Sequence, residues 1–268
     1  MIDKIKKVIN NPKLALRKAR YNFFDFSTLY GIKKKKIKEI VRSMSFEAGE
    51  KIALITAYNN NYKQIGDICS FRIKKYSKLN SYGYMVFESE NLTARPYPWN
   101  KIIFLYLALG GTLNKSPAYP WVMWIDADAF VVNYNYNLID QIINTAPPET
   151  ELIITKDICG INTGVMIFKN SSFSKKLLEK IWSYKKYTEH PWWEQAALVE
   201  LVEKKWKGLQ DKIYFVQQNI LNAYSYGLYN KAFSEGELNA ASFIYHIPGR
   251  ISVEAKAGII NKLNLADR

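Results

Sequence analysis

The chain has 268 residues, of which 48% are hydrophobic and 15% aromatic, and its formal net charge is +14. This length and apolar content are sufficient for one sizeable core, and they exclude a disordered or fibrous chain. No apolar run of about 18 residues predicts a membrane-spanning helix. Lysines 4, 6 and 7 interrupt the segment where a secretory signal would stand, so we expect a cytoplasmic protein.

Positive charge is concentrated near the N-terminus, where residues 1–50 contain 13 Lys and Arg against 5 Asp and Glu. We expect residues 1–45 to form a basic helical extension and residues 46–268 to form the catalytic domain. The extension can contact an anionic membrane, which would place the protein at the inner face of that membrane. It can equally be a helical cap whose lysines are solvated.

The middle of the chain alternates between strand and helix patterns. Residues 52–58 are a continuous apolar run that ends in three asparagines, which is typical of a buried parallel strand followed by a loop. The next expected elements are a helix at 65–79, a strand at 82–88, a helix at 99–110 and a strand at 121–125. Further strands are expected at 152–155, 165–168 and 243–246, and helices at 174–184 and 194–206. The pattern predicts an α/β fold with a mostly parallel sheet, whose ligands bind beyond residues 58 and 125.

Two carboxylates follow the expected strand at 121–125. Asp126 and Asp128 are separated by one residue, so they can converge on one divalent cation at the mouth of the sheet. Oxygen ligands favour Mn²⁺ or Mg²⁺, and a nucleotide diphosphate would supply further oxygens. The alternative is that two acids merely end a strand at the solvent.

One of the two histidines, His246, also ends an apolar run. Its imidazole can complete a carboxylate metal site, although a lone histidine is more often a structural group. Gly249 would let the backbone approach a phosphate, and Arg250 would add positive charge.

Several motifs together resemble one glycosyltransferase family. They are Trp99-Asn100-Lys101, Trp124-Ile125-Asp126-Ala127-Asp128-Ala129, Gly160-Ile161-Asn162-Thr163-Gly164-Val165, Glu194-Gln195-Ala196-Ala197-Leu198 and His246-Ile247-Pro248-Gly249. They are similar to motifs of the retaining galactosyl-, mannosyl- and xyloglucan xylosyltransferases, the GMA12/MNN10-like family. The resemblance implies a GT-A-type nucleotide-diphospho-sugar transferase fold.

The resemblance also implies roles for individual residues. The Mn²⁺ ligands would be Asp126, Asp128 and His246. The donor-binding residues would be Thr56, Tyr58, Lys101, Asp126, Asn162, Gly249 and Arg250, with the first two near the base and Lys101 and Asn162 on the sugar. Glu194 and Gln195 would lie under the reacting sugar as catalytic residues.

Two positions depart from the family pattern. Trp193 stands where the family has an acid, and Ile251 stands where it has a lysine that serves the phosphate. Arg250 or Lys256 would take over that role, and we prefer Arg250. Trp192 and Trp193 can begin a helix packed on the core, or they can stack on a sugar ring.

These observations predict a retaining glycosyltransferase that moves a hexose or pentose from a UDP-sugar to a glycan or lipid-linked acceptor. One alternative is a different retaining GT-A family that uses UDP-glucose or UDP-galactose. A second is a basic nucleic-acid-binding protein without catalysis, although we expect no specific nucleic-acid partner.

Overall fold

The computed structural model describes residues 44–110, 119–224, 236–249 and 251–264, together with residues 32, 35 and 38–40. The expected basic extension lies almost entirely outside these ranges, and so does Arg250. Among the described residues, no helix has the length and apolarity needed to cross a membrane.

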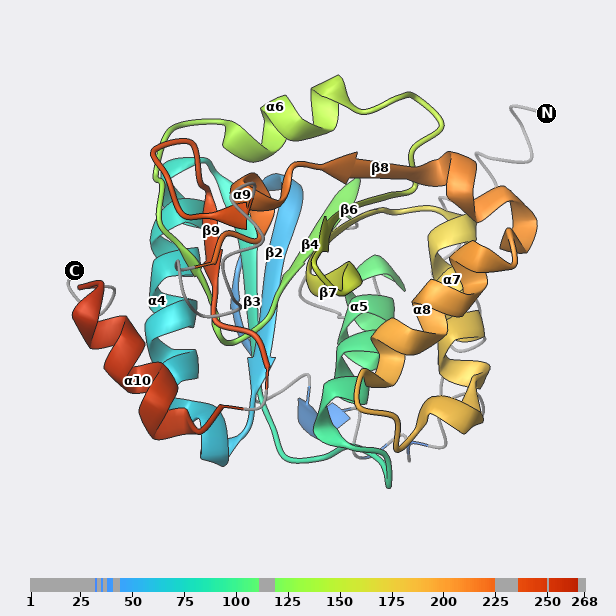
Figure 1. Cartoon of the computed structure of the whole chain (residues 1–268), viewed down its shortest axis with the longest axis horizontal. Coiled ribbons are helices and arrows are strands. Elements are labelled where there is room, and N and C mark those ends of the chain that lie inside the picture. The colour runs from blue at the N-terminus through green and yellow to red at the C-terminus, as the bar shows by residue number, and fades with distance from the viewer. Residues whose placement is uncertain are drawn as a thin grey trace, which may run out of the picture.

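A seven-stranded sheet forms the centre of the molecule (Figure 1). Its strands, in spatial order, are β1 (Ser45–Glu47), β3 (Tyr82–Glu88), β2 (Glu50–Tyr58), β4 (Trp121–Ile125), β7 (Gly160–Lys169), β6 (Leu152–Asp157) and β8 (Ile213–Val216). Only β1 and β7 run against the other strands. The expected α/β fold with a mostly parallel sheet is therefore confirmed.

Helices cover both faces of this sheet. They are α4 (Lys63–Leu79), α5 (Asn100–Gly110), α6 (Leu138–Thr145), α7 (Ser172–Ser183), α8 (Trp193–Glu203), α9 (Gln218–Leu221) and α10 (Val253–Lys262). Short 3₁₀ turns are η1 (Asn60–Tyr62), η2 (Tyr97–Trp99), η3 (Lys185–Tyr187) and η4 (Trp206–Lys212). In Figure 1, α4 and α10 lie on one side of the sheet, and α5, α7 and α8 lie on the other.

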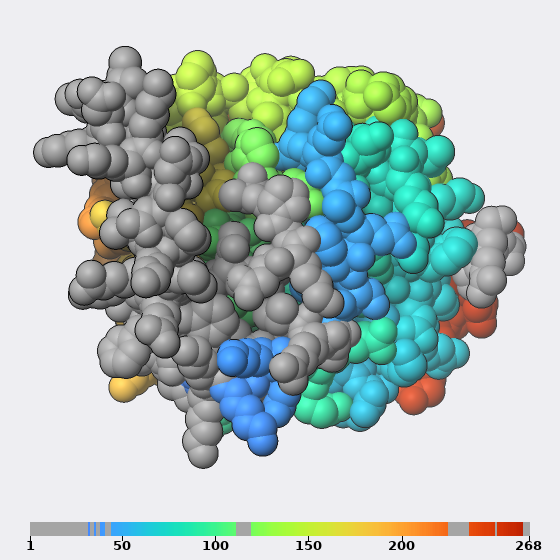
Figure 2. Space-filling view, turned by 180° about the vertical axis from the view of Figure 1, so that it is seen from behind, coloured from blue at the N-terminus to red at the C-terminus, as the bar shows by residue number. Residues whose placement is uncertain are grey.

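The side chains of the central strands alternate between two cores. In β2, Ile52 and Leu54 join the core beside α4, whereas Ala53 and Ile55 join the core beside α5. This alternation explains the continuous apolar run, because a strand covered on both faces needs apolar residues at every position. At the sheet edge, β1 and α4 lie side by side (Figure 2), and Glu47 pairs there with Lys74 at 2.6 Å.

The unit β2–α4–β3–α5–β4 confirms the expected order of strands and helices, with each boundary within about two residues of the expectation. Because β2 and β4 are neighbouring parallel strands, their carboxyl ends meet at one edge of the sheet. The loops that follow residues 58 and 125 therefore lie together, as expected. A second, two-stranded sheet pairs β5 (Ala129–Val131) with β9 (Ile244–His246) beside this edge.

Candidate active site

A cavity of about 730 Å³ opens at this edge of the sheet, which is a usual size for a small-molecule site. The expected site residues that line it are Tyr58, Lys101, Asp126, Asp128, Asn162, Glu194, Gln195, His246 and Gly249. Thr56 is not among the lining residues, because its side chain is fully buried in β2. Arg250 lies outside the described residues.

The three expected metal ligands lie together. One ligand atom from each of Asp126, Asp128 and His246 lies within 4.8 Å of the other two, and His246 Nε2 is 3.3 Å from Asp128 Oδ1. The antiparallel pairing of β5 with β9 sets Ala129 opposite His246, which brings the histidine beside the two acids. Two carboxylates and an imidazole can hold a divalent cation. The Asp128 side chain is only 13% exposed and is paired with His246, so the two acids are not simply a solvated strand end.

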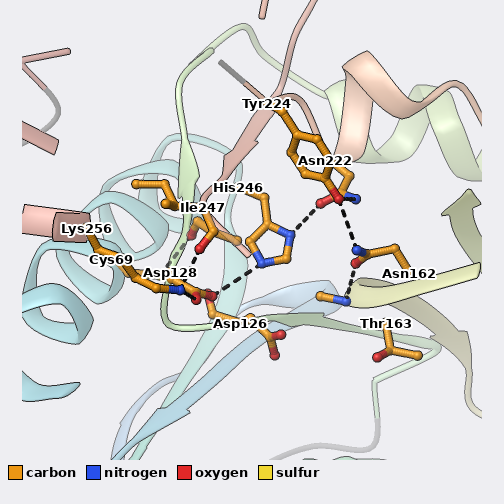
Figure 3. A network of polar contacts seen from close by, with 12 residues as sticks. Cys69, Asp126, Asp128, Asn162, Thr163, Asn222, Tyr224, His246, Ile247 and Lys256 are labelled. Carbon is orange, nitrogen blue, oxygen red and sulfur yellow. Dashed lines mark hydrogen bonds and ion pairs between the residues drawn. The ribbon is translucent and has the colours of Figure 1, made fainter. Parts of the chain in front are cut away.

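Neighbouring residues orient the imidazole of His246 (Figure 3). Its Nδ1 bonds to the side-chain oxygen of Asn222, which leaves Nε2 facing Asp128. A Cβ atom at Gly164 would lie 2.2 Å from His246 Cε1, so the ring can occupy this place only above a glycine. Metal-binding histidines usually donate their second nitrogen to such a partner. The surroundings therefore fit a ligand role for His246.

The Asn222 side chain continues this network toward Tyr224 and Asn162 (Figure 3), which both line the cavity. Asn222 Nδ2 donates to the Tyr224 hydroxyl at 3.1 Å, and Tyr224 donates to Asp157 Oδ2 at 2.6 Å. Asn162 Nδ2 donates to the same carboxylate oxygen at 2.6 Å. Hydrogen bonds thus connect the histidine with the residue expected to bind the sugar. No local pattern in the sequence indicated Asn222 or Tyr224.

The three candidate metal ligands, Asp126, Asp128 and His246, are called the metal-ligand group below. Lys256 is fully buried beside this group. Its ammonium bonds to Asp128 Oδ2 and donates to the Ile247 carbonyl at 2.6 Å. Burial alone would raise the pKa of Asp128, but hydrogen bonding to His246 and the charge of Lys256 together lower it. Asp128 is therefore ionised at neutral pH. The structure places one of the two candidate phosphate cations, Lys256, at this group.

Lys101 joins the metal-ligand group to the expected catalytic acid. Its Nζ is 2.9 Å from Asp126 Oδ1 and 3.0 Å from Glu194 Oε1, and it donates to the Thr163 carbonyl at 3.0 Å. Burial lowers the pKa of Lys101, but the two carboxylates outweigh burial and raise it above its ordinary value. The lysine remains a cation and balances both acids, which is a different set of contacts from the expected one with the donor sugar.

Glu194 and Gln195 are both held by Thr163. The Thr163 hydroxyl donates to Glu194 Oε1 at 3.1 Å, and its backbone N–H donates to Gln195 Oε1 at 3.2 Å. Among the described residues, the buried Glu194 Oε2 has no hydrogen-bond partner. Burial also raises the pKa of Glu194. A buried oxygen without a partner in a cavity wall is the kind of group that a ligand hydroxyl satisfies.

Comparisons with solved structures identify the fold. A glycosyltransferase involved in the glycosylation of the major capsid of PBCV-1 superposes with a TM-score of 0.63 and 17% identity, over 79% of this chain and 98% of that one. The galactosyltransferase LgtC, in complex with donor and acceptor sugar analogs, gives a TM-score of 0.50 and 12% identity, over 78% and 95%. The fold is therefore of the expected GT-A type.

Curated relatives match only part of the chain and are themselves longer than the matched part. An uncharacterized alpha-1,2-galactosyltransferase of Schizosaccharomyces pombe is 27% identical over an alignment of length 140 that covers 40% of this chain and 36% of the relative. The probable alpha-1,6-mannosyltransferase MNN10 of Saccharomyces cerevisiae is 26% identical over an alignment of length 190 that covers 58% of this chain and 46% of the relative. The chain thus spans less than half the length of these relatives.

The model of one protein family matches most of the chain, over residues 48–147 and 143–243. The matched ranges contain β2, β4, the acids of the metal-ligand group and the start of α8. The chain therefore belongs to the galactosyl transferase GMA12/MNN10 family.

Proposed function

We propose that this chain is a retaining, metal-dependent glycosyltransferase that uses a UDP-sugar and transfers its hexose or pentose to a glycan or lipid-linked acceptor. One observation carries the proposal. The cavity holds three candidate metal ligands together with the buried Glu194 Oε2, to which no residue in the described part of the chain donates a hydrogen bond. A donor needs both features, because its diphosphate requires a cation and its sugar requires hydrogen-bond acceptors.

Asp126, Asp128 and His246 would hold Mn²⁺ or Mg²⁺. When bound, the cation neutralises charge that develops on the leaving diphosphate. Gly249 lines the same end of the cavity, and its left-handed backbone (φ 90°) permits a close approach to phosphate. Lys256 does not line the cavity, but its ammonium bonds to Asp128 beside it.

Glu194 and Gln195 would act on the sugar itself. Glu194 Oε2 can accept a hydrogen bond from a sugar hydroxyl and stabilise positive charge near the anomeric carbon. The amide nitrogen of Gln195 can donate a hydrogen bond to the sugar ring. The acceptor hydroxyl would attack from the face that the diphosphate leaves, and the leaving phosphate would take its proton. This route retains the anomeric configuration without an enzyme nucleophile.

Calorimetric titration with UDP, with and without Mn²⁺, tests the donor site, and GDP is the nucleotide control. We expect UDP binding that requires Mn²⁺ and that is lost in Asp128→Asn, a variant that keeps the shape of the side chain beside Lys256. Asp140→Asn is the matched control, because Asp140 accepts a hydrogen bond from Tyr82 at 2.5 Å and does not line the cavity. Absence of UDP binding with every divalent metal would contradict the proposal.

Proton NMR of the first product tests the stereochemical part, since an inverted anomeric configuration would exclude the same-face mechanism.

The cytoplasmic location, the domain boundary at residue 45 and membrane contact by residues 1–45 stay predictions. Liposome co-sedimentation at low salt, with and without residues 1–45, tests the last of these.

A further inference from the structure

The rim of the cavity exposes two large apolar side chains. The large hydrophobic side chains exposed among the described residues are Phe71, Leu79, Tyr136, Ile158, Trp192 and Ile251. Of these, Ile158 and Trp192 line the cavity, with exposed fractions of 42% and 43%. Large apolar groups that face solvent in a cavity wall mark a ligand-binding surface.

Hydrogen bonds and a ring contact position Trp192 at this rim. Its backbone N–H donates to His190 Nδ1 at 3.1 Å, and its carbonyl accepts from Gln195 N at 2.9 Å where α8 begins. The indole packs at 70° against the His190 ring, which packs at 86° against Tyr187. A surface that is already ordered loses little conformational entropy when a ligand binds.

The adjacent Trp193 has a different environment. Its side chain is partly buried and packs against the core beside α5, α7 and α8. Its φ of 42° is left-handed, which is strained for a bulky residue and is typical of functional sites. Trp193 therefore belongs to the helix start packed on the core, although it also lines the cavity, whereas Trp192 is the more exposed of the two lining tryptophans.

Trp192 lies closer to solvent than Glu194, since its side chain is 43% exposed and that of Glu194 is 4% exposed. Glu194, two residues further on, is buried and bonds to Lys101 and Thr163 in the cavity wall. The donor sugar would lie beside Glu194. The acceptor must then lie between this sugar and the solvent. An indole face matches the apolar C–H face of a pyranose ring, while the polar edges of that ring can remain hydrated or hydrogen-bonded.

We propose that Trp192 and Ile158 form an acceptor platform, on which a pyranose ring of the glycan acceptor stacks against the indole. The inference rests on the proposed function and adds the chemical group of the acceptor that is recognised. A free glycan and a lipid-linked glycan present the same ring, so the platform recognises the saccharide portion of either one.

Thiol labelling provides a direct test. The two cysteines of the chain are Cys159, which is exposed and lines the cavity next to Ile158, and Cys69, which is buried. The labelling rate of Cys159 is measured with UDP and Mn²⁺ present, at increasing concentrations of one sugar probe. The probes are methyl α-mannopyranoside, methyl β-galactopyranoside and lactose. We expect at least one of these sugars to protect Cys159 in the wild-type protein.

Substitutions then identify the stacking group. Trp192→Ala should raise the half-protecting sugar concentration about tenfold or more, and Trp192→Phe should keep it within about threefold because an aromatic face remains. Tyr136→Ala is the matched control, since Tyr136 is 66% exposed and lies outside the cavity. Thermal melting of each variant verifies that it is folded.

Three outcomes would overturn the platform. The sugars protect Cys159 from labelling equally well in Trp192→Ala and in the wild type, or they protect it as poorly in Trp192→Phe as in Trp192→Ala, or no probe protects Cys159 in any of the proteins. Calorimetry with UDP separates this failure from that of the proposed function. If UDP binds and Trp192→Ala leaves the protection of Cys159 by sugars unchanged, only the platform is overturned. If sugars protect Cys159 but UDP does not bind, the platform is supported and the donor assignment is contradicted.

Discussion

Replacing Asn222 should weaken metal binding although Asn222 is not a metal ligand. Its side chain is fully buried and bonds to Nδ1 of His246. In Asn222→Ala this buried nitrogen loses its partner, which costs about 1–3 kcal/mol. The ring is then no longer held with Nε2 toward Asp128. Because about 1.4 kcal/mol corresponds to a tenfold change in affinity, and loss of such outer partners typically costs about 10–100-fold, we expect Mn²⁺ affinity to fall by that factor.

Electron paramagnetic resonance of free Mn²⁺ measures this affinity independently of catalysis. Asn80→Ala is the matched control, because buried Asn80 donates to the Tyr76 carbonyl at 2.9 Å and accepts from Asn137 N at 2.7 Å, and it does not line the cavity. It should lose stability without a change in Mn²⁺ affinity, and Asn222→Asp should recover most of the affinity. A folded Asn222→Ala protein that binds Mn²⁺ as tightly as the wild type would refute the reasoning.

Three further predictions concern the cavity and the helical layer. Gly164→Ala should displace the His246 ring, because the new Cβ would meet it at 2.2 Å, and calorimetry should show Mn²⁺ binding lost while far-ultraviolet circular dichroism is retained; unchanged binding would contradict this geometry. Glu194→Gln should lower the rate of UDP release from the sugar donor by about 10²–10³-fold with UDP affinity within about threefold, so a near-normal rate would remove Glu194 from catalysis. Hydrogen bonds from two lysines and a tyrosine lower the pKa of Glu200 from its ordinary 4.5 to about 2, so its contribution to stability is present above pH 4.5 and is lost as pH falls toward 2. Urea unfolding should therefore show a steeper loss of stability between pH 5 and 3 for the wild type than for Glu200→Gln, and equal slopes would exclude this contribution.

Local patterns predicted the elements that contain long apolar runs. The strands at 52–58 and 121–125 were expected because burial on both faces of a strand leaves a continuous apolar run, and the helix at 65–79 was expected because burial on one face leaves a helical period. The strands β1, β5 and β8 have three or four residues, which is too short to show a period. The helices α6 and α10 were not expected, although their sequences contain apolar positions that indicate them.

The sequence by itself determined that two carboxylates end one strand and a histidine ends another, because strand termination is a local property. Only the tertiary structure decided their neighbours. Pairing of β5 with β9 brings His246 to Asp128, while Lys256 and Asn222 reach the group from other segments. Such contacts depend on the packing of elements that are distant in the chain, and buried charges and polar groups select partners in space, where sequence spacing carries no information.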